Sequence, residues 1–230
     1  MKINNLNIAF KDLVLYKDFS LDIKDSEITC MLGKSGVGKS TLLNAISHSK
    51  NYIDCIDNNL KTAYVYQSPR LIPTISIYDN LKFVMDKEDN ELITKTLEAF
   101  KILDCINKTP NVISGGQASR VAICRAIVYK PDMLLLDEPF KDLDIALKKD
   151  LLTLLKNYMH ENKIGAIYVT HDIDEALYMA DRILVFDGRP IDIKLDLKID
   201  DIVDKKYGCE ALDKYRHIVY NSLMNEGENV

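Results

Sequence analysis

The feature that most restricts the fold of this chain is a glycine-rich segment, Gly33–Thr41. Its sequence, Gly-Lys-Ser-Gly-Val-Gly-Lys-Ser-Thr, fits the pattern G-x-x-x-x-G-K-[ST] in full. The apolar residues 28–32 before it indicate a buried strand, and residues 40–46 after it indicate the start of a helix. A strand, a loop and a helix in this order form the context that a phosphate-binding loop requires. The sequence therefore predicts a nucleotide-binding protein.

The chemistry of such a loop follows from its residue types. Glycines let the backbone pass close to phosphates, and the N–H groups at the helix start point toward the anion. We expect Lys39 to bridge the outer phosphates and the Ser40 hydroxyl to bind Mg²⁺. The alternative is an accidental match in a glycine-rich turn, which average residue usage produces in about one chain of this length in a hundred.

Length and composition bound the class of protein. The 230 residues, 47% of them hydrophobic, are enough for one large globular domain, or one domain with a small insert. A net charge of −5 gives no reason to expect nucleic acid as a partner. No apolar run is long enough to span a membrane, and the first residues lack the apolar core of a signal peptide, so we expect a cytosolic location. The five scattered cysteines lack metal-ligand spacing and indicate thiols in a reducing compartment.

The pattern along the chain predicts an α/β fold with a mostly parallel sheet flanked by helices. Alternating residues at 3–10 and 19–23 predict an antiparallel N-terminal β subdomain. Short apolar runs alternate with helical runs, as in a parallel sheet: we expect strands at 63–66, 133–136, 166–169 and, as the last strand, 183–186, and helices at 117–129, 145–160 and 174–179. Residues 76–105 are helical in pattern, with Asp89 or Asn90 as a cap. We therefore expect a single domain over 1–230. Its core is expected at about 1–75 and 114–195, a helical insert at about 76–113 and a C-terminal tail at 196–230. In this tail, Leu212, Tyr215 and Val219 indicate a packed final helix.

Polar residues follow the ends of several predicted strands, where ligands bind in open parallel sheets. Asp137 is placed to hold Mg²⁺, and Glu138 to polarise a water for attack on the γ-phosphate. His171 could donate to the γ-phosphate, and Gln67 could ligate Mg²⁺ and orient water. The alternatives are an acidic turn at 137–139, a structural histidine and an ordinary polar turn residue.

A second glycine-containing helix start, Ser114-Gly-Gly-Gln117, also has the character of a phosphate cradle. It is remote in topology from Gly33–Thr41, so one chain would not bring both onto one nucleotide. Two chains related by a two-fold axis could, each covering the nucleotide of the other. The alternative is a simple Gly-Gly helix cap.

Six motifs occur in a fixed order: Gly33–Thr41, Gln67, Ile113–Gln117, Met133–Pro139, Phe140–Asp144 and Val169–His171. Together they resemble the ATP-binding subunit of an ABC transporter, over roughly residues 1–190. The resemblance implies an ATPase that binds ATP with Mg²⁺ and works as a dimer of such subunits.

The resemblance also implies a role for each matching residue. ATP is held by an aromatic residue that stacks on adenine, Phe10 or more weakly Tyr16, and by Gly33, Lys34, Ser35, Gly36, Val37, Gly38, Lys39, Ser40 and Thr41. Glu138 is the catalytic base, with His171 and Gln67 as further catalytic residues, and Ser40, Gln67 and Asp137 are the metal ligands. The residues that act on the partner's ATP are Ser114, Gly115, Gly116, Gln117 and Asp144.

Within the family, Glu138–Phe140 and residues 169–177 are similar to importers of the nitrate, sulfonate and taurine group, some of whose relatives carry thiamine precursors. The resemblance implies membrane permease subunits and an upstream solute-binding protein as partners, with peripheral attachment to the cytoplasmic face of the membrane. The candidates for contact with the permease are Leu71, Ile72, Ile77 and Tyr78, which could instead form the core of the insert.

The chain departs from the family pattern at Lys34, at Lys141-Asp142 and in the shortened, glycine-free region after the phosphate loop. Two other functions compete with an importer subunit. One is a soluble ABC ATPase that acts on ribosomes or DNA, although this chain has one cassette and a short insert. The other is a regulatory nucleotide binder without hydrolysis, which the intact Glu138 and His171 oppose.

Overall fold

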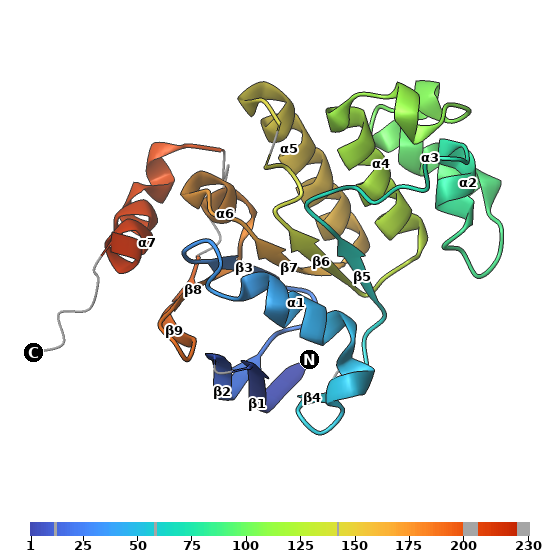
Figure 1. Ribbon diagram of the computed structural model, residues 1–230. Helices are drawn as coiled ribbons and strands as arrows, with labels where there is room; N and C mark the ends of the chain where they lie inside the picture. The colour runs from blue at the N-terminus through green and yellow to red at the C-terminus, as the bar shows by residue number, and fades with distance from the viewer. Residues whose placement is uncertain (12, 58, 142, 200–206, 225–230) are drawn as a thin grey trace, which may run out of the picture. The chain divides into compact units, whose positions relative to one another are not determined.

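The structure, a computed structural model, describes residues 1–11, 13–57, 59–141, 143–199 and 207–224 (Figure 1). The chain forms two compact units. Unit 1 comprises residues 1–60 and 165–230, and unit 2 comprises residues 61–164. None of the helices in the described ranges is long and apolar enough to cross a membrane.

Unit 1 begins with a small antiparallel sheet, in the order β2-β1-β4. Its strands are β1 (Lys2–Phe10), β2 (Leu13–Asp22) and β4 (Ile56–Asp57). The alternation that predicted these strands places Ile3, Leu6 and Ile8 in the core, at 7% exposure or less. The predicted antiparallel subdomain is confirmed, but its second strand begins at Leu13, well before the predicted start at residue 19.

The second sheet of unit 1 positions the phosphate loop. β3 (Ile28–Leu32) pairs in parallel with β7 (Gly165–Val169) on one side and with β8 (Arg182–Asp187) on the other. Every residue of β3 and β7 is buried, which explains their continuous apolar sequences. α1 (Lys39–Ser47) and α6 (Ile173–Met179) pack against these strands, and a 3₁₀ turn (Ser49–Tyr52) follows α1.

Strand β8 is not the last strand, contrary to the prediction from the sequence. β9 (Asp192–Lys198) follows β8 and pairs with it in antiparallel fashion, and its alternate residues Ile193, Leu195 and Leu197 are half-buried. The predicted final helix is present as α7 (Asp213–Met224), preceded by a 3₁₀ turn (Glu210–Leu212). Leu212, Tyr215 and Val219 are buried as expected.

Unit 2 holds the parallel strand pair β5 (Thr62–Val65) and β6 (Met133–Asp137), with α4 (Gly115–Val128) packed against β5. The other helices are α2 (Ile77–Lys82), α3 (Asn90–Ala99) and α5 (Ile145–Asn162), with 3₁₀ turns at Leu103–Cys105 and Pro110–Val112. Asp89, not Asn90, caps α3 by accepting a hydrogen bond from the N–H of Leu92. The predicted α/β class is confirmed, whereas the single-domain boundaries remain a prediction.

Candidate nucleotide site

The glycine-rich segment of unit 1 connects β3 to α1, as its sequence predicted. Gly38 is the N-cap of α1 with φ 123°, a conformation that side chains rarely adopt. A Cβ at this position would lie 2.4 Å from Cδ1 of Ile191. The N-cap residue is itself a glycine without a side chain, and no capping side chain is found among the described residues, so the first turn of this helix keeps the polarity that attracts anions.

Lys39 is held inside the loop that it follows. Its ammonium donates to the backbone carbonyl of Gly33 at 2.7 Å and to that of Lys34 at 3.0 Å, and the residue is only 5% exposed. The positive charge is therefore fixed beside the start of α1, where Ser40 is exposed. This arrangement suits a phosphate group with its metal ion, because oxygen ligands are what Mg²⁺ prefers.

Two aromatic residues were candidates to stack on adenine, and the structure separates them. Phe10, the last residue of β1, is 57% exposed and presents its ring to solvent. Tyr16 is 1% exposed, and its hydroxyl donates to the carbonyl of Gly38 at 3.0 Å. The interpretation of Tyr16 as a stacking residue is wrong, because its ring is in the core and its hydroxyl supports the phosphate loop. Phe10 remains the prediction.

His171 follows the end of β7, also in unit 1, and is exposed. Its neighbour Thr170 is buried at 2% exposure, and Asp172 caps α6 by accepting from the N–H groups of Asp174 and Glu175. An exposed histidine is thus carried between two fixed residues.

Asp137 ends β6 in unit 2 and accepts a hydrogen bond, 2.9 Å long, from the Tyr64 hydroxyl on the neighbouring strand. The Tyr64 ring stacks on Tyr66 with centroids 4.0 Å apart, and the Arg70 guanidinium lies 3.6 Å above the Tyr66 ring. Burial, and then the charge of Asp137, raise the pKa of Tyr64 well above its usual value, so the phenol stays a neutral donor. The sequence analysis missed Tyr64, although it stands three residues before Gln67 on a predicted strand.

We expect Tyr64→Phe to raise the Mg²⁺ concentration needed for half-maximal ATPase activity by about tenfold or more, since a hydrogen bond to a charged group contributes roughly 1.5–3 kcal/mol. Magnesium titration of the ATPase rate and of nucleotide binding would measure this shift. Tyr66→Phe is the matched control, because it keeps the stacked rings and leaves the bond to Asp137 in place. An equal shift in both variants would contradict a specific role for the Tyr64 hydroxyl.

Glu138 follows Asp137 with φ 46°, a left-handed conformation that is uncommon outside glycine. Its Oε2 forms an ion pair, 2.9 Å long, with the ammonium of Lys141, one of the residues at which the chain departs from the family pattern. The neighbouring departure, Asp142, lies outside the described residues. The candidate base is thus oriented by a lysine that follows it by three residues.

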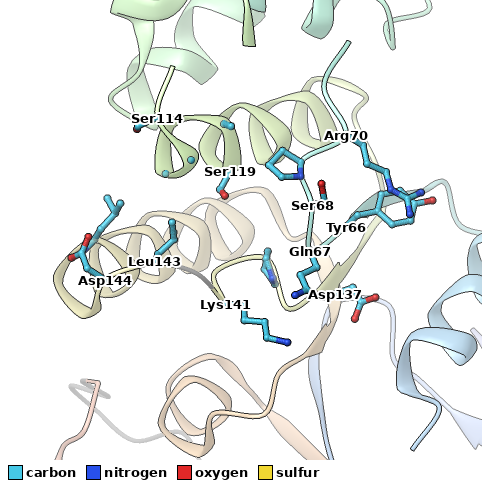
Figure 2. Close-up of a pocket in the computed structure, with 16 residues that line it drawn as sticks. Tyr66, Gln67, Ser68, Arg70, Ser114, Ser119, Asp137, Lys141, Leu143 and Asp144 are labelled. Atoms are coloured by element: carbon cyan, nitrogen blue, oxygen red, sulfur yellow. The ribbon is translucent and has the colours of Figure 1, made fainter. Parts of the chain in front are cut away.

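A cavity of about 830 Å³ lies within unit 2 and gathers several of the predicted residues (Figure 2). Its lining comes from the segment after β5, from the start of α4 and from the segment between β6 and α5. The predicted site residues among its walls are Gln67, Ser114, Gly115, Gly116, Asp137 and Asp144. Gln117 and Glu138 are not among the lining residues, and the phosphate loop, Phe10 and His171 belong to unit 1.

The segment Ser114–Gln117 begins α4 with a complete capping box. Ser114 Oγ accepts from the N–H of Gln117, and Gln117 Oε1 accepts from the N–H of Ser114. The side chains of Ser114 and Gln117 thus cap the helix, and their role toward the ATP of a partner stays a prediction. The glycines differ. A Cβ at Gly116 would lie 2.6 Å from Leu147 Cδ2, whereas a Cβ at Gly115 would meet no atom of the described residues within 4 Å outside its own turn of helix.

Two further contacts fix the surroundings of the cavity. Asp144 caps α5 by accepting from the N–H of Leu147 at 3.0 Å. Arg125 of α4 donates to the carbonyls of Pro69 and Arg70, at 3.1 and 2.9 Å, and so holds the segment that follows Gln67. Arg125 was not predicted, because its partners are more than fifty residues away in the sequence.

A family model described as ABC transporter matches residues 16–141. The chain belongs to the ABC transporter family. It is similar to the aliphatic sulfonates import ATP-binding protein SsuB of Zymomonas mobilis, with 32% identity over 91% of this chain and 92% of the relative. It is also similar to MJ0796, described as a bacterial ABC transporter cassette, in a dimeric structure, with 26% identity and a TM-score of 0.74 over 87% of this chain and 99% of that one. A second dimeric MJ0796 structure, in a post-hydrolysis state with ADP and Pi, matches with 25% identity and a TM-score of 0.71 over the same shares.

Within the described ranges, no group of three or more His, Cys, Asp and Glu side chains is arranged to hold a metal ion. A magnesium ion in this family member would thus take most of its ligands from phosphate and water, with one or two protein oxygens. Ser40, Gln67 and Asp137 supply oxygens of the required kind.

Proposed function

We propose that this ABC family member is the ATP-binding and ATP-hydrolysing subunit of an importer of a small solute. The observation that carries the proposal is the complete phosphate loop, with its left-handed glycine at position 38 and its buried cation at Lys39. The similarity to import ATP-binding proteins supports the importer class.

ATP is held in this proposal by residues of unit 1. The backbone of the phosphate loop and the ammonium of Lys39 bind the phosphates, and the exposed ring of Phe10 stacks on adenine. The set comprises Phe10, Gly33, Lys34, Ser35, Gly36, Val37, Gly38, Lys39, Ser40 and Thr41.

Hydrolysis is assigned to three side chains. Glu138 takes a proton from the attacking water, and His171 and Gln67 contact the γ-phosphate and orient the water. Ser40, Gln67 and Asp137 would hold Mg²⁺, which would supply positive charge to neutralise the phosphates. The hydrogen bond from Tyr64 keeps Asp137 in one orientation, which supports its assignment as a ligand.

The dimer follows from Gly115, the first residue of α4. Outside its own turn of helix, no atom of the described residues lies within 4 Å of the position of a Cβ there, and φ is not left-handed, so nothing in the described part of the chain requires glycine. An approaching phosphate of a second subunit would require it. We therefore assign Ser114, Gly115, Gly116, Gln117 and Asp144 to the ATP of the partner, and the dimeric MJ0796 structures are consistent with this assembly.

We expect Gly115→Ala to fold normally and to lose ATP-driven dimerisation, because the added methyl group meets open space in the monomer and a phosphate in the dimer. Size-exclusion chromatography with ATP and Mg²⁺, in a background that blocks hydrolysis, measures the dimer, and thermal melting checks the fold. The matched control is Ala99→Ser, an equally small addition to an exposed residue of α3 in the same unit. A normal ATP-bound dimer for Gly115→Ala would contradict the assignment.

We propose that the membrane permease contacts unit 2. Ile77 is fully buried, so its interpretation as a contact residue is wrong, and it belongs to the core of unit 2. A groove of about 420 Å³ offers a better surface. It is lined by Phe83, which is 73% exposed, and by Val84, Arg125 and Tyr129. Its apolar floor and exposed aromatic rim suit a short helix of a permease.

The solute class and the location complete the proposal. Sulfonates are the favoured cargo, since several relatives are named as aliphatic sulfonates import proteins, and a thiamine precursor is the second candidate. A solute-binding protein delivers the solute, and the subunit lies at the cytoplasmic face of the membrane through its permease. No nucleic acid takes part.

The proposal is tested by co-expressing this chain with the permease and the solute-binding protein encoded beside its gene. The solute-binding protein is first screened against sulfonates, nitrate and thiamine precursors, and uptake of the bound solute is then measured. ATP-dependent uptake that is lost when this chain is omitted supports an importer. ATPase activity without any permease partner, but with stimulation by ribosomes or DNA, would favour the soluble ATPase, and ATP binding without hydrolysis would favour the regulator.

A further inference from the structure

His171 is carried by a loop of only three residues, Thr170–Asp172, between the end of β7 and the start of α6. Thr170 organises this loop, although it is 2% exposed and does not reach the surface. Its hydroxyl donates to Oε2 of Glu175 at 2.7 Å and accepts from the N–H of Asp172 at 3.1 Å. The residues on both sides of His171 are therefore tied to each other.

The acceptor of this tie is a buried carboxylate. Glu175, on the first turn of α6, is 3% exposed and accepts a second hydrogen bond, also 2.7 Å long, from the Tyr168 hydroxyl on β7. Burial, and then the charge of Glu175, raise the pKa of Tyr168 well above its usual value, which keeps this hydroxyl a donor. A carboxylate in the core is costly unless its hydrogen bonds are made, so its two short bonds fix the loop at both ends.

A second set of contacts links this loop to the C-terminal part of unit 1. Arg216 of α7 donates from Nε at 3.0 Å and from Nη2 at 2.7 Å to Oδ1 of Asp174, the residue before Glu175. The Tyr207 hydroxyl donates to Asp172 at 3.3 Å, and the Tyr207 ring meets Tyr178 of α6 edge to face, with centroids 6.1 Å apart. The first turn of α6 is thus held from inside by Thr170 and Tyr168, and from outside by the chain around α7.

We propose that residues 207–224 hold His171 in its working position, with Arg216 and Glu175 as positioning residues that act through the first turn of α6. The proposal rests on the function proposed above, in which His171 contacts the γ-phosphate. A three-residue loop transmits any shift of α6 directly to His171, and a small misplacement of a catalytic group lowers the rate strongly. Residues 207–224 would then be part of the catalytic apparatus rather than a passive extension of the fold.

The test compares three variants of the full chain at temperatures where each is folded. Arg216→Met removes the contact with Asp174, and Arg216→Lys keeps the charge without the two-nitrogen geometry. Asp213→Asn is the matched control, because it removes the charge of a residue that pairs with the same arginine within α7 while the arginine and Asp174 both remain. The readouts are kcat and KM for ATP, the melting temperature, and hydrogen–deuterium exchange of the peptide that covers residues 168–175.

We expect Arg216→Met to lower kcat by about three- to tenfold with KM changed by less than about twofold, the pattern of a misplaced group that does not bind the ground state. Exchange of the 168–175 peptide increases in the same variant. Arg216→Lys recovers part of kcat, and Asp213→Asn stays close to the wild type.

Unchanged kcat in Arg216→Met, or unchanged exchange at 168–175, overturns the proposal, as does a lower melting temperature with both of these unchanged. The exchange measurement needs no ATP hydrolysis. Increased exchange in a chain whose wild type does not hydrolyse ATP would therefore count against the proposed function, while leaving the structural link between α7 and the His171 loop in place.

Discussion

Replacing Glu138 by glutamine is expected to abolish ATP hydrolysis, leave ATP binding intact and trap an ATP-bound dimer. Loss of a general base lowers the rate by about 10²–10⁴-fold. Glutamine has the same shape, so the left-handed backbone at this position and the neighbouring segment are preserved. It also ends the ion pair with Lys141, which is partly exposed and contributes little to stability.

Phosphate release measures the loss of hydrolysis, and size-exclusion chromatography with ATP and Mg²⁺ measures the dimer. Glu161→Gln, a change at an exposed carboxylate near the end of α5, is the control and should behave as the wild type. Glu138→Gln that elutes only as a monomer under these conditions would refute the two-subunit site. Rapid hydrolysis by the same variant would remove Glu138 from the role of base.

Replacing Lys39 by methionine is expected to weaken ATP binding by at least about tenfold, because a charge-assisted hydrogen bond to phosphate contributes roughly 1.5–3 kcal/mol. The change also removes the donor for the carbonyls of Gly33 and Lys34, so the loop itself becomes less ordered. A modest fall in melting temperature should therefore accompany the loss of affinity.

Fluorescent-nucleotide titration gives the affinity, and the melting curve separates it from unfolding. Lys24→Met is the control, since Lys24 lies in the same unit, is 67% exposed and forms an ion pair with Glu27 away from the phosphate loop. An ATP affinity equal to that of the wild type in Lys39→Met would mean that this loop does not hold the phosphates.

Features that depend on neighbouring residues were predictable from the sequence. The phosphate loop is a contiguous pattern, and Asp137 could be placed because a buried strand ends where its apolar run ends. Strand β9 was also within reach, because its residues alternate between apolar and charged and follow a Gly-Arg-Pro turn at 188–190.

Features that depend on residues far apart in the chain were not predictable. Tyr16 has the residue type and spacing of a stacking aromatic, and only the fold shows that its hydroxyl lies against Gly38. Tyr64 and Asp137 are 73 residues apart, and no local pattern indicates that strand pairing brings them together. The same holds for Arg216 and Asp174, which come together only when α7 packs on α6.

The hydrogen bonds from Arg125 to the carbonyls of Pro69 and Arg70 link one end of α4 to the segment after Gln67. From Gly115 to Arg125 the helix rises by ten residue steps, about 15 Å. A tilt of about 10° about the Arg125 end would therefore carry Gly115 sideways by roughly 2.5 Å. A displacement of the segment after Gln67 that tilts α4 through Arg125 would therefore move Gly115 at the other end of the helix. Arg125 would couple the two positions.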